Sequence, residues 1–337
     1  MDVAPEVPGL RSMNLSTKPD CPIKYTITTL NSSDEPQSNT ILIVFINGLG
    51  LPQASWQPTL RLLQADLAAA SSSAGTRYPG IHAVTYDRYG QGLSQPPHGA
   101  KPAPHDLLDA VSDLSAFLDG VKSFHLPENN STRLFLVAHS IGVPLSRLYA
   151  ERHPGSVAAL LVLDSNMANN DFVSLFPDPD TPSFDPQRDL PPDTTPDQLR
   201  AARRFAQAMF HPSAPNGENL DRSTLPALLP LSDGPILIGD SSNEEGKPPL
   251  LLQVVGHDPE TFAEESLKVS PRGLTERYVQ PAWERYNEGL LAIGGAAAGS
   301  RKVVIAPGCG HFIQKNNPRF VADEVIAMVK VLCDGRA

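Results

Sequence analysis

Short apolar segments alternate with helical patterns along the first half of the chain. Each apolar segment has between five and eight residues, a length typical of strands buried on both faces. The expected strands are 24–30, 41–46, 81–87, 134–138 and 157–164, and the expected helices are 59–70, 106–121 and 144–153. Because strands of this kind separated by helices form a parallel sheet with both faces covered, the pattern predicts an α/β fold.

A proline-rich stretch between Phe176 and Pro249 interrupts this alternation. It contains a helical pattern of its own over 196–212. The apolar residues expected on one face of that helix are Leu199, Phe205, Met209 and Phe210. Because the stretch keeps an apolar face, we interpret it as an inserted subdomain rather than a linker.

The α/β pattern resumes after the proline-rich stretch. A strand is expected over 249–255, helical stretches over 260–291, a further strand over 301–307 and an amphipathic helix over 318–332. We expect this last helix to pack back onto the sheet.

Composition and charge narrow the range of partners. The chain has 337 residues, 19% of them charged, and a formal net charge of -10, which is typical of a soluble, enzyme-sized protein. It has no basic cluster longer than the pair Arg203 and Arg204, whereas nucleic-acid binding requires an extended basic surface. We therefore expect no nucleic-acid partner and a small neutral or apolar molecule as substrate.

The expected compartment follows from the chain start and the cysteines. The first residues carry acidic side chains and prolines where a secretion signal needs a basic end and an apolar run. The apolar segment 41–46 stops at Asn47, far short of the roughly 18 to 20 residues that span a bilayer. Three cysteines, Cys21, Cys309 and Cys333, do not make a disulfide framework. We expect a cytoplasmic protein with no membrane partner, and the sequence leaves its oligomeric state open.

Ser140 lies where an expected strand passes directly into an expected helix. Residues 138–142, Ala-His-Ser-Ile-Gly, match the nucleophile elbow G-x-S-x-G, with alanine in the first small position. Small residues flank the serine because the sharp turn brings strand and helix close together. Ser140 is therefore the candidate nucleophile. His139 precedes it and is expected to be structural, because neighbouring side chains diverge at such a turn.

A serine hydroxyl needs a base within hydrogen-bond reach to become a nucleophile. Among nine histidines, His311 follows an expected strand and two glycines, so its ring can lie over the end of the sheet. We predict His311 as the general base. The functional residues then follow one another as serine, acid and histidine, which is the order found in hydrolases.

The base in turn needs a carboxylate that holds its tautomer and stabilises the imidazolium. Asp258 follows the strand 249–255, the strand that usually delivers the acid, but it stands only two residues after Gly256. Asp164 ends the strand that follows the elbow helix. The sequence does not separate these two aspartates, and both remain candidates.

Two backbone N–H groups are candidates for an oxyanion hole. One belongs to Ile141, directly after the serine, and the other to Leu49 in the loop Asn47-Gly48-Leu49-Gly50 that follows the strand 41–46. Glycines in that loop let the backbone approach a substrate. This set of residues needs no cofactor and no metal ion, and we expect neither.

Four motifs occur in a characteristic order: "INGLG", "YDRYGQGLS" over 86–94, "AHSIG" and "GCGHF". Together they resemble the α/β-hydrolase superfamily over roughly residues 22–333. That superfamily has a His-Gly oxyanion loop, a D-x-R-G-x-G-x-S segment, the serine elbow and the histidine at these places. Asn47 replaces the usual histidine, which we expect to be tolerated because the donor in that loop is a backbone N–H.

The resemblance implies an α/β-hydrolase fold: a mostly parallel eight-stranded sheet, helices on both faces and a cap inserted after the sixth strand. It divides the chain into an N-terminal extension (1–21), a first core part (22–168), the cap (169–247) and a second core part (248–337).

The function expected from these residues is a serine hydrolase that cleaves an ester, lactone or thioester through acylation of Ser140. The substrate is expected to be small and apolar, and by analogy a specialised metabolite. An acyltransferase or cyclisation enzyme would use the same residues. A non-catalytic ligand receptor of the same fold is the alternative from a different class.

Overall fold

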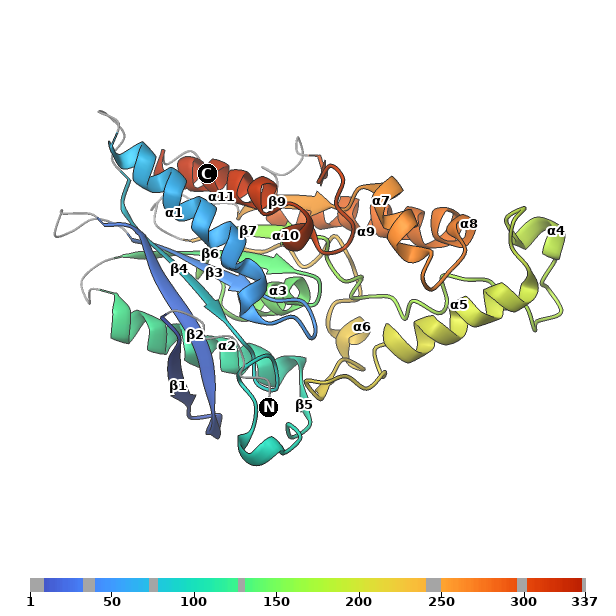
Figure 1. Ribbon diagram of the computed structural model, residues 1–337, viewed down its shortest axis with the longest axis horizontal. Helices are drawn as coiled ribbons and strands as arrows, with labels where there is room; N and C mark the ends of the chain where they lie inside the picture. The colour runs from blue at the N-terminus through green and yellow to red at the C-terminus, as the bar shows by residue number, and fades with distance from the viewer. Residues whose placement is uncertain are drawn as a thin grey trace.

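A single large sheet, covered by helices on both faces, forms the centre of the fold (Figure 1). The computed structural model describes residues 9–32, 40–72, 78–126, 131–240, 250–295 and 302–334, without the side chains of residues 71 and 72. The strand order is β1-β2-β4-β3-β6-β7-β9-β10. These strands are β1 (Arg11–Leu15), β2 (Lys18–Asn31), β3 (Thr40–Ile46), β4 (Gly80–Tyr86), β6 (Thr132–His139), β7 (Val157–Leu163), β9 (Leu251–Gly256) and β10 (Val304–Ile305).

Parallel pairing runs from β4 through β3, β6, β7 and β9 to β10, and β1 and β2 are added antiparallel at one edge. The predicted α/β class, with a mostly parallel eight-stranded sheet, is therefore confirmed. The last strand is shorter than the expected 301–307 and contains only Val304 and Ile305. Its expected first residue, Arg301, lies outside the described residues.

Strand β3 illustrates why these segments lie in the middle of the sheet. Leu42, Val44 and Ile46 point into the core on one face, whereas Ile41, Ile43 and Phe45 point into the core on the other. Successive side chains of a strand alternate between faces, so a strand that is apolar at every position has both faces buried.

Two pairs of helices bury these faces. Helices α1 (Gln57–Ser72) and α11 (Pro318–Cys333) pack on one face, and α2 (Leu107–His125) and α3 (Gly142–Arg152) on the other. Helix α2 begins at a capping box, in which the Asp106 side chain accepts hydrogen bonds from Leu108 N and Asp109 N. All four helices were predicted from the sequence, with ends that differ by a few residues.

The remaining elements are short or lie outside the large sheet. Between β9 and β10 the chain forms α7 (Pro259–Ser266), α8 (Arg272–Leu274), η3 (Thr275–Val279), α9 (Gln280–Leu290) and η4 (Leu291–Gly294), and α10 (Ile313–Asn316) precedes α11. Two further turns are η1 (Gln53–Trp56) and η2 (Pro97–Gly99). A small parallel pair joins β5 (His105–Asp106) to β8 (Leu220–Asp221).

The N-terminal boundary differs from the expected one at residue 22. Strand β1 pairs with β2 from Arg11 onward, with Met13 opposite Ile23, so residues 11–15 and 18–21 belong to the sheet. Prolines at 19 and 22 obscured the strand pattern. Both lie where β2 has only β1 as a neighbour, and proline is tolerated there. Residues 1–8 of the expected extension lie outside the described residues.

The described part of the segment between β7 and β9 adds no strand to the large sheet. Its described part contains α4 (Pro186–Asp189), α5 (Pro196–Met209), β8 and α6 (Leu225–Leu228), and residues 241–247 of the expected cap lie outside the described residues. Figure 1 shows α4 and α5 extending away from the sheet. We call residues 165–240 the inserted segment.

The expected apolar face of the helix in this segment is correct only in part. Leu199 is buried, together with Ala202 and Ala206. These three residues lie on one face of the helix, because they are three and four positions apart. Met209 and Phe210, at the end of α5, are 55% and 45% exposed, although the Phe210 ring still contacts Phe172 at 5.7 Å. No helix in the described part of the chain is long and apolar enough to cross a membrane.

Gly142 at the start of α3 offers a test of how tightly this helix is packed. A Cβ atom there would lie 2.6 Å from the carbonyl oxygen of Ile46, at the end of β3. We predict that Gly142→Ala lowers the free energy of unfolding by about 1–3 kcal/mol, because neither backbone can move freely. Gly217→Ala is the matched control, since nothing lies within 4 Å of its Cβ position. Urea denaturation should separate the two variants, and equal stabilities would contradict this packing.

Candidate active site

Ser140 occupies the strained turn between β6 and α3. Its backbone φ is 53°, in the left-handed region that a non-glycine residue rarely adopts. The Ser140 N–H donates a hydrogen bond of 3.2 Å to Leu163 O at the end of β7. A Cβ atom at Gly48 would lie 3.2 Å from Ser140 Cβ, so the adjacent loop passes close to the serine. The sequence around Ser140 therefore forms the expected elbow, with the side chain at the carboxyl edge of the sheet.

Ser140, His311 and Asp164 form a continuous hydrogen-bonded chain. The Ser140 hydroxyl lies 3.1 Å from His311 Nε2, and His311 Nδ1 donates to Asp164 Oδ2 at 2.6 Å. These contacts join residues that are more than a hundred positions apart in the sequence. They match the geometry of a nucleophile, a base and an orienting acid.

Asp258, the other candidate acid, lies elsewhere. Its carboxylate caps α7 by accepting hydrogen bonds from Glu260 N and Thr261 N, and it also accepts one from Gly308 N at 3.1 Å. These backbone donors lower the pKa of Asp258 below its usual value. Asp258 N–H donates to Cys309 O at 2.7 Å. The residue thus fixes the loop that carries His311 without contacting the imidazole.

A second histidine, His257, binds the other oxygen of Asp164. Its Nδ1 and its backbone N–H donate to Asp164 Oδ1 at 2.8 and 3.3 Å. Its Nε2 lies 2.8 Å from Gln280 Oε1, and the Gln280 amide is oriented by donating to Glu284 Oε1 at 3.0 Å. Both ring nitrogens of His257 therefore act as donors, which is the imidazolium form. His257 thus supplies a positive charge beside the buried carboxylate.

Sequence reasoning missed His257, although it is the residue directly before Asp258 in the "GHDPE" segment. The same segment follows the strand that usually delivers the acid. A histidine at this strand end was the available signal, but its partner Asp164 lies 93 positions away.

The expected oxyanion loop follows β3. Within the described part of the chain, neither Leu49 N–H nor Ile141 N–H donates to a protein acceptor. The Asn47 side chain, by contrast, is buried and donates to Tyr86 O at 3.0 Å, and it accepts a hydrogen bond from Trp56 Nε1. Asn47 thus anchors the base of the loop, which is a role that an amide side chain can fill in place of histidine.

A family model described as the alpha/beta hydrolase family matches residues 43–324. That is more than half of the chain. The chain belongs to the alpha/beta hydrolase family. The resemblance seen in its four motifs and the prediction that it is an α/β-hydrolase are therefore confirmed.

Solved structures agree with this fold at low sequence identity. A probable hydrolytic enzyme from Pseudomonas aeruginosa PAO1 aligns with a TM-score of 0.51 and 14% identity, covering 94% of this chain and 93% of that one. A mutant epoxide hydrolase from Vigna radiata aligns with a TM-score of 0.50 and 14% identity, covering 95% and 98%. A thermophilic esterase from Thermogutta terrifontis aligns with a TM-score of 0.48 and 14% identity, covering 96% of this chain and 99% of that one. No curated protein matches the sequence.

Asp164 of this α/β-hydrolase is completely buried. Burial alone raises the pKa of a carboxyl group. Here the charge of His257 and the hydrogen bonds from His257 and His311 outweigh burial, so the pKa of Asp164 lies well below its usual value. Conversely, burial lowers the pKa of His257, but the Asp164 charge outweighs it and raises that pKa. The carboxylate therefore stays ionised beside His311.

His139 lies beneath the site, as expected for a structural residue. It is fully buried, and its Nε2 donates to the backbone oxygen of His311 at 2.8 Å. Its Nδ1 has no hydrogen-bond partner among the described residues. Burial, and the positive charge that His311 can carry, lower the pKa of His139 to about 3. His139 is therefore neutral and holds the backbone of the loop that carries His311.

Aromatic side chains surround the His311 ring. Trp283 from α9 and Phe312 lie with ring centroids 5.5 and 5.2 Å from it. Phe172, from the inserted segment, contacts Trp283 at 5.9 Å. The inserted segment thus reaches the apolar surroundings of the site.

A cavity of about 490 Å³ lies apart from Ser140 and is lined in part by His257, Gln280 and Glu284. Among the described residues there is no cluster of three or more histidine, cysteine, aspartate or glutamate side chains that could hold a metal ion.

The neutral His139 predicts an acid-dependent loss of stability. Its folded pKa is about 3, whereas an unfolded histidine has a pKa of about 6.5, so below pH 6.5 only the unfolded chain takes up this proton. We predict that stability falls as the pH is lowered from about 6.5 towards 3, and that His139→Gln reduces this fall. Urea midpoints measured over this pH range for both proteins test the prediction. Parallel pH profiles would contradict it.

Proposed function

We propose that this α/β-hydrolase is a serine hydrolase that cleaves an ester, lactone or thioester of a small apolar substrate. The observation that carries the proposal is the chain from Ser140 Oγ through His311 to the buried Asp164, with distances of 3.1 and 2.6 Å. Each member has the residue type and the position that acyl transfer requires, and the lowered pKa of Asp164 keeps that carboxylate ionised.

The proposed reaction begins when His311 Nε2 takes the proton of the Ser140 hydroxyl while Oγ attacks the substrate carbonyl. The N–H groups of Leu49 and Ile141 donate to the oxyanion that forms. His311 then gives the proton to the leaving alcohol or thiol as the acyl-enzyme forms. A water molecule, deprotonated by His311, attacks that acyl group and releases the acid and the free serine.

Asp164 supports each of these proton transfers. Because it accepts from His311 Nδ1, it keeps Nε2 free to act as a base. It also stabilises the imidazolium after proton transfer. His257 keeps Asp164 from becoming an uncompensated buried charge.

Ser140 also argues against two other reactions of this fold. The openers of epoxides and the enzymes that cleave carbon–halogen bonds use an aspartate nucleophile, and this chain has serine at that turn. The likeness to the epoxide hydrolase from Vigna radiata is one of fold.

The substrate class rests on the surroundings of the site. Trp283, Phe312 and Phe172 provide apolar surface near His311. We propose that residues 169–247 act as the cap that shapes the acyl pocket.

We also propose a cytoplasmic location, supported by the absence of disulfides among Cys21, Cys309 and Cys333.

A fluorophosphonate probe tests the nucleophile. We predict that it labels the wild-type protein on Ser140, because the probe needs an activated serine, and that Ser140→Ala abolishes labelling. A series of p-nitrophenyl esters of graded chain length, with a few lactones, then measures turnover. A folded wild-type protein that does not label would be a receptor rather than an enzyme. If Ser140 labels but products form only when an alcohol or amine is added, the result would indicate an acyltransferase.

A pair of amide variants tests the acid. Asp164→Asn removes the acceptor that fixes the His311 tautomer, so we expect kcat to fall by roughly 10⁴-fold, as in the best-known serine triad. Asp258→Asn is the matched control, because it alters only the cap of α7 and the loop before His311. We expect its kcat to change little and its stability to fall by about 1 kcal/mol. Equal losses of kcat in the two variants would exclude Asp164 as the specific orienting acid.

A further inference from the structure

A carboxylate from the inserted segment binds the backbone of the oxyanion loop. Glu218 Oε1 accepts a hydrogen bond of 2.6 Å from Gly50 N–H, across 168 positions of sequence. Gly50 directly follows Leu49, whose N–H is the proposed second oxyanion donor. The loop therefore depends on a residue that lies outside the core part of the fold.

Arg88 holds the other side of the same loop. Its guanidinium donates to Asn47 O at 2.5 Å and to Gly48 O at 3.3 Å. Gln91 adds a hydrogen bond of 2.9 Å to Gly48 O. The backbone on both sides of Leu49 is thus fixed by hydrogen bonds from side chains.

Glu218 and Arg88 also bind each other. Arg88 Nη2 lies 3.0 Å from Glu218 Oε2, and the two side chains are 5% and 2% exposed. Gln91 Nε2 donates to Glu218 Oε1 at 2.8 Å. Because buried charges require partners, the ion pair links the inserted segment and the oxyanion loop into one unit.

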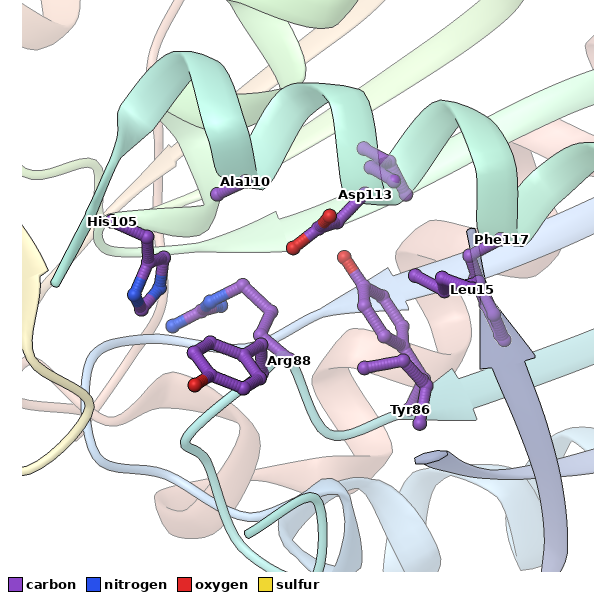
Figure 2. Close-up of a pocket in the computed structure, with 10 residues that line it drawn as sticks. Leu15, Tyr86, Arg88, His105, Ala110, Asp113 and Phe117 are labelled. Atoms are coloured by element: carbon purple, nitrogen blue, oxygen red, sulfur yellow. The ribbon is translucent and has the colours of Figure 1, made fainter. Parts of the chain in front are cut away.

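Among the described residues, Glu218 is the carboxylate that forms an ion pair with Arg88. Arg88 also borders a cavity of about 10 Å³, too small for a ligand, which Figure 2 shows between Arg88, His105, Tyr86 and Asp113. Asp113 pairs instead with Lys18 at 3.3 Å. Burial lowers the pKa of His105, which disfavours a positive charge on this ring beside Arg88.

The stretch around Glu218 is docked firmly on the core. Strand β8 pairs with β5, and Asn219 Nδ2 donates to Pro102 O at 2.9 Å. Gly90, within the "YDRYGQGLS" motif, has a φ of +78°, and a Cβ there would lie 2.7 Å from Glu218 O. The motif thus leaves room for this contact, and the position of Glu218 is determined by backbone as well as by charge.

We propose that Glu218 is a positioning residue for the oxyanion hole: it fixes Gly50, and thereby the Leu49 N–H, where the transition-state oxyanion forms. This role rests on the proposed serine hydrolase function. Small displacements of such a donor reduce the rate of the chemical step more than they weaken substrate binding.

Two amide variants within the inserted segment test the role. Glu218→Gln retains an oxygen that can accept from Gly50 N–H, but it removes the charge and turns an amide N–H₂ towards Arg88. Asp240→Asn is the matched control, because Asp240 forms a comparable pair with Arg133 at 2.7 Å and has no described contact with the oxyanion loop. Glu218→Ala removes both interactions, and circular dichroism and thermal melting establish which variants fold.

The assay uses the p-nitrophenyl ester with the highest turnover in the graded series, together with its thionoester. Sulfur accepts hydrogen bonds more weakly than oxygen, so a thionoester gains less from the oxyanion donors. We expect Glu218→Gln to lower kcat for the ester by about 10- to 100-fold, at or below the loss caused by removing one oxyanion donor, with KM changed less than about threefold. The thionoester should lose less, whereas Asp240→Asn should behave as wild type.

The outcomes separate the two proposals. A wild-type protein whose Ser140 does not label with fluorophosphonate would refute the serine hydrolase function itself. If Ser140 labels, then a folded Glu218→Ala variant with wild-type kcat would refute the positioning role alone, because this variant lacks both the acceptor for Gly50 N–H and the charge beside Arg88. Equal losses for ester and thionoester would also refute it, because they would indicate a general structural effect. A larger loss for the ester supports the assignment.

Discussion

The candidate active site depends on keeping one fully buried carboxylate ionised. Asp164 is removed from water, which by itself favours the protonated acid. Hydrogen bonds from His311 to one oxygen and from His257 to the other compensate for this burial, and the His257 charge contributes further. If either imidazole were absent, the buried charge would lose part of its compensation and the His311 ring its fixed orientation.

The parallel sheet brings these groups together. Strands β6, β7 and β9 end at the same edge, and their carboxyl ends carry Ser140, Asp164 and His257 in neighbouring positions. His311 reaches this edge from the loop that Asp258 holds at Gly308. The apolar residues of each strand therefore fix the position of the polar group that follows it. The geometry of the site thus depends on the packing of the core.

The sequence was sufficient for features that are local. The strand pattern predicted the sheet, and the elbow motif placed Ser140 at its turn, because both depend on nearby residues. The choice between Asp164 and Asp258 was not local, since it depends on the path of the loop that carries His311. His257 and Glu218 were missed for the same reason: their partners lie 93 and 168 positions away. The strands within residues 11–21 were missed because prolines interrupt the strand pattern there. Those prolines are tolerated because this part of β2 pairs only with β1.

The protonation of His311 tests the central claim of this account most directly. Nitrogen NMR of histidine-labelled protein, with the His311 signals assigned by comparison with His311→Gln, reads the tautomer of the resting site. The hydrogen bond to Asp164 predicts a proton on Nδ1 and an unprotonated Nε2 facing Ser140. A proton on Nε2 with Nδ1 unprotonated would contradict the account, because His311 could not then accept the serine proton.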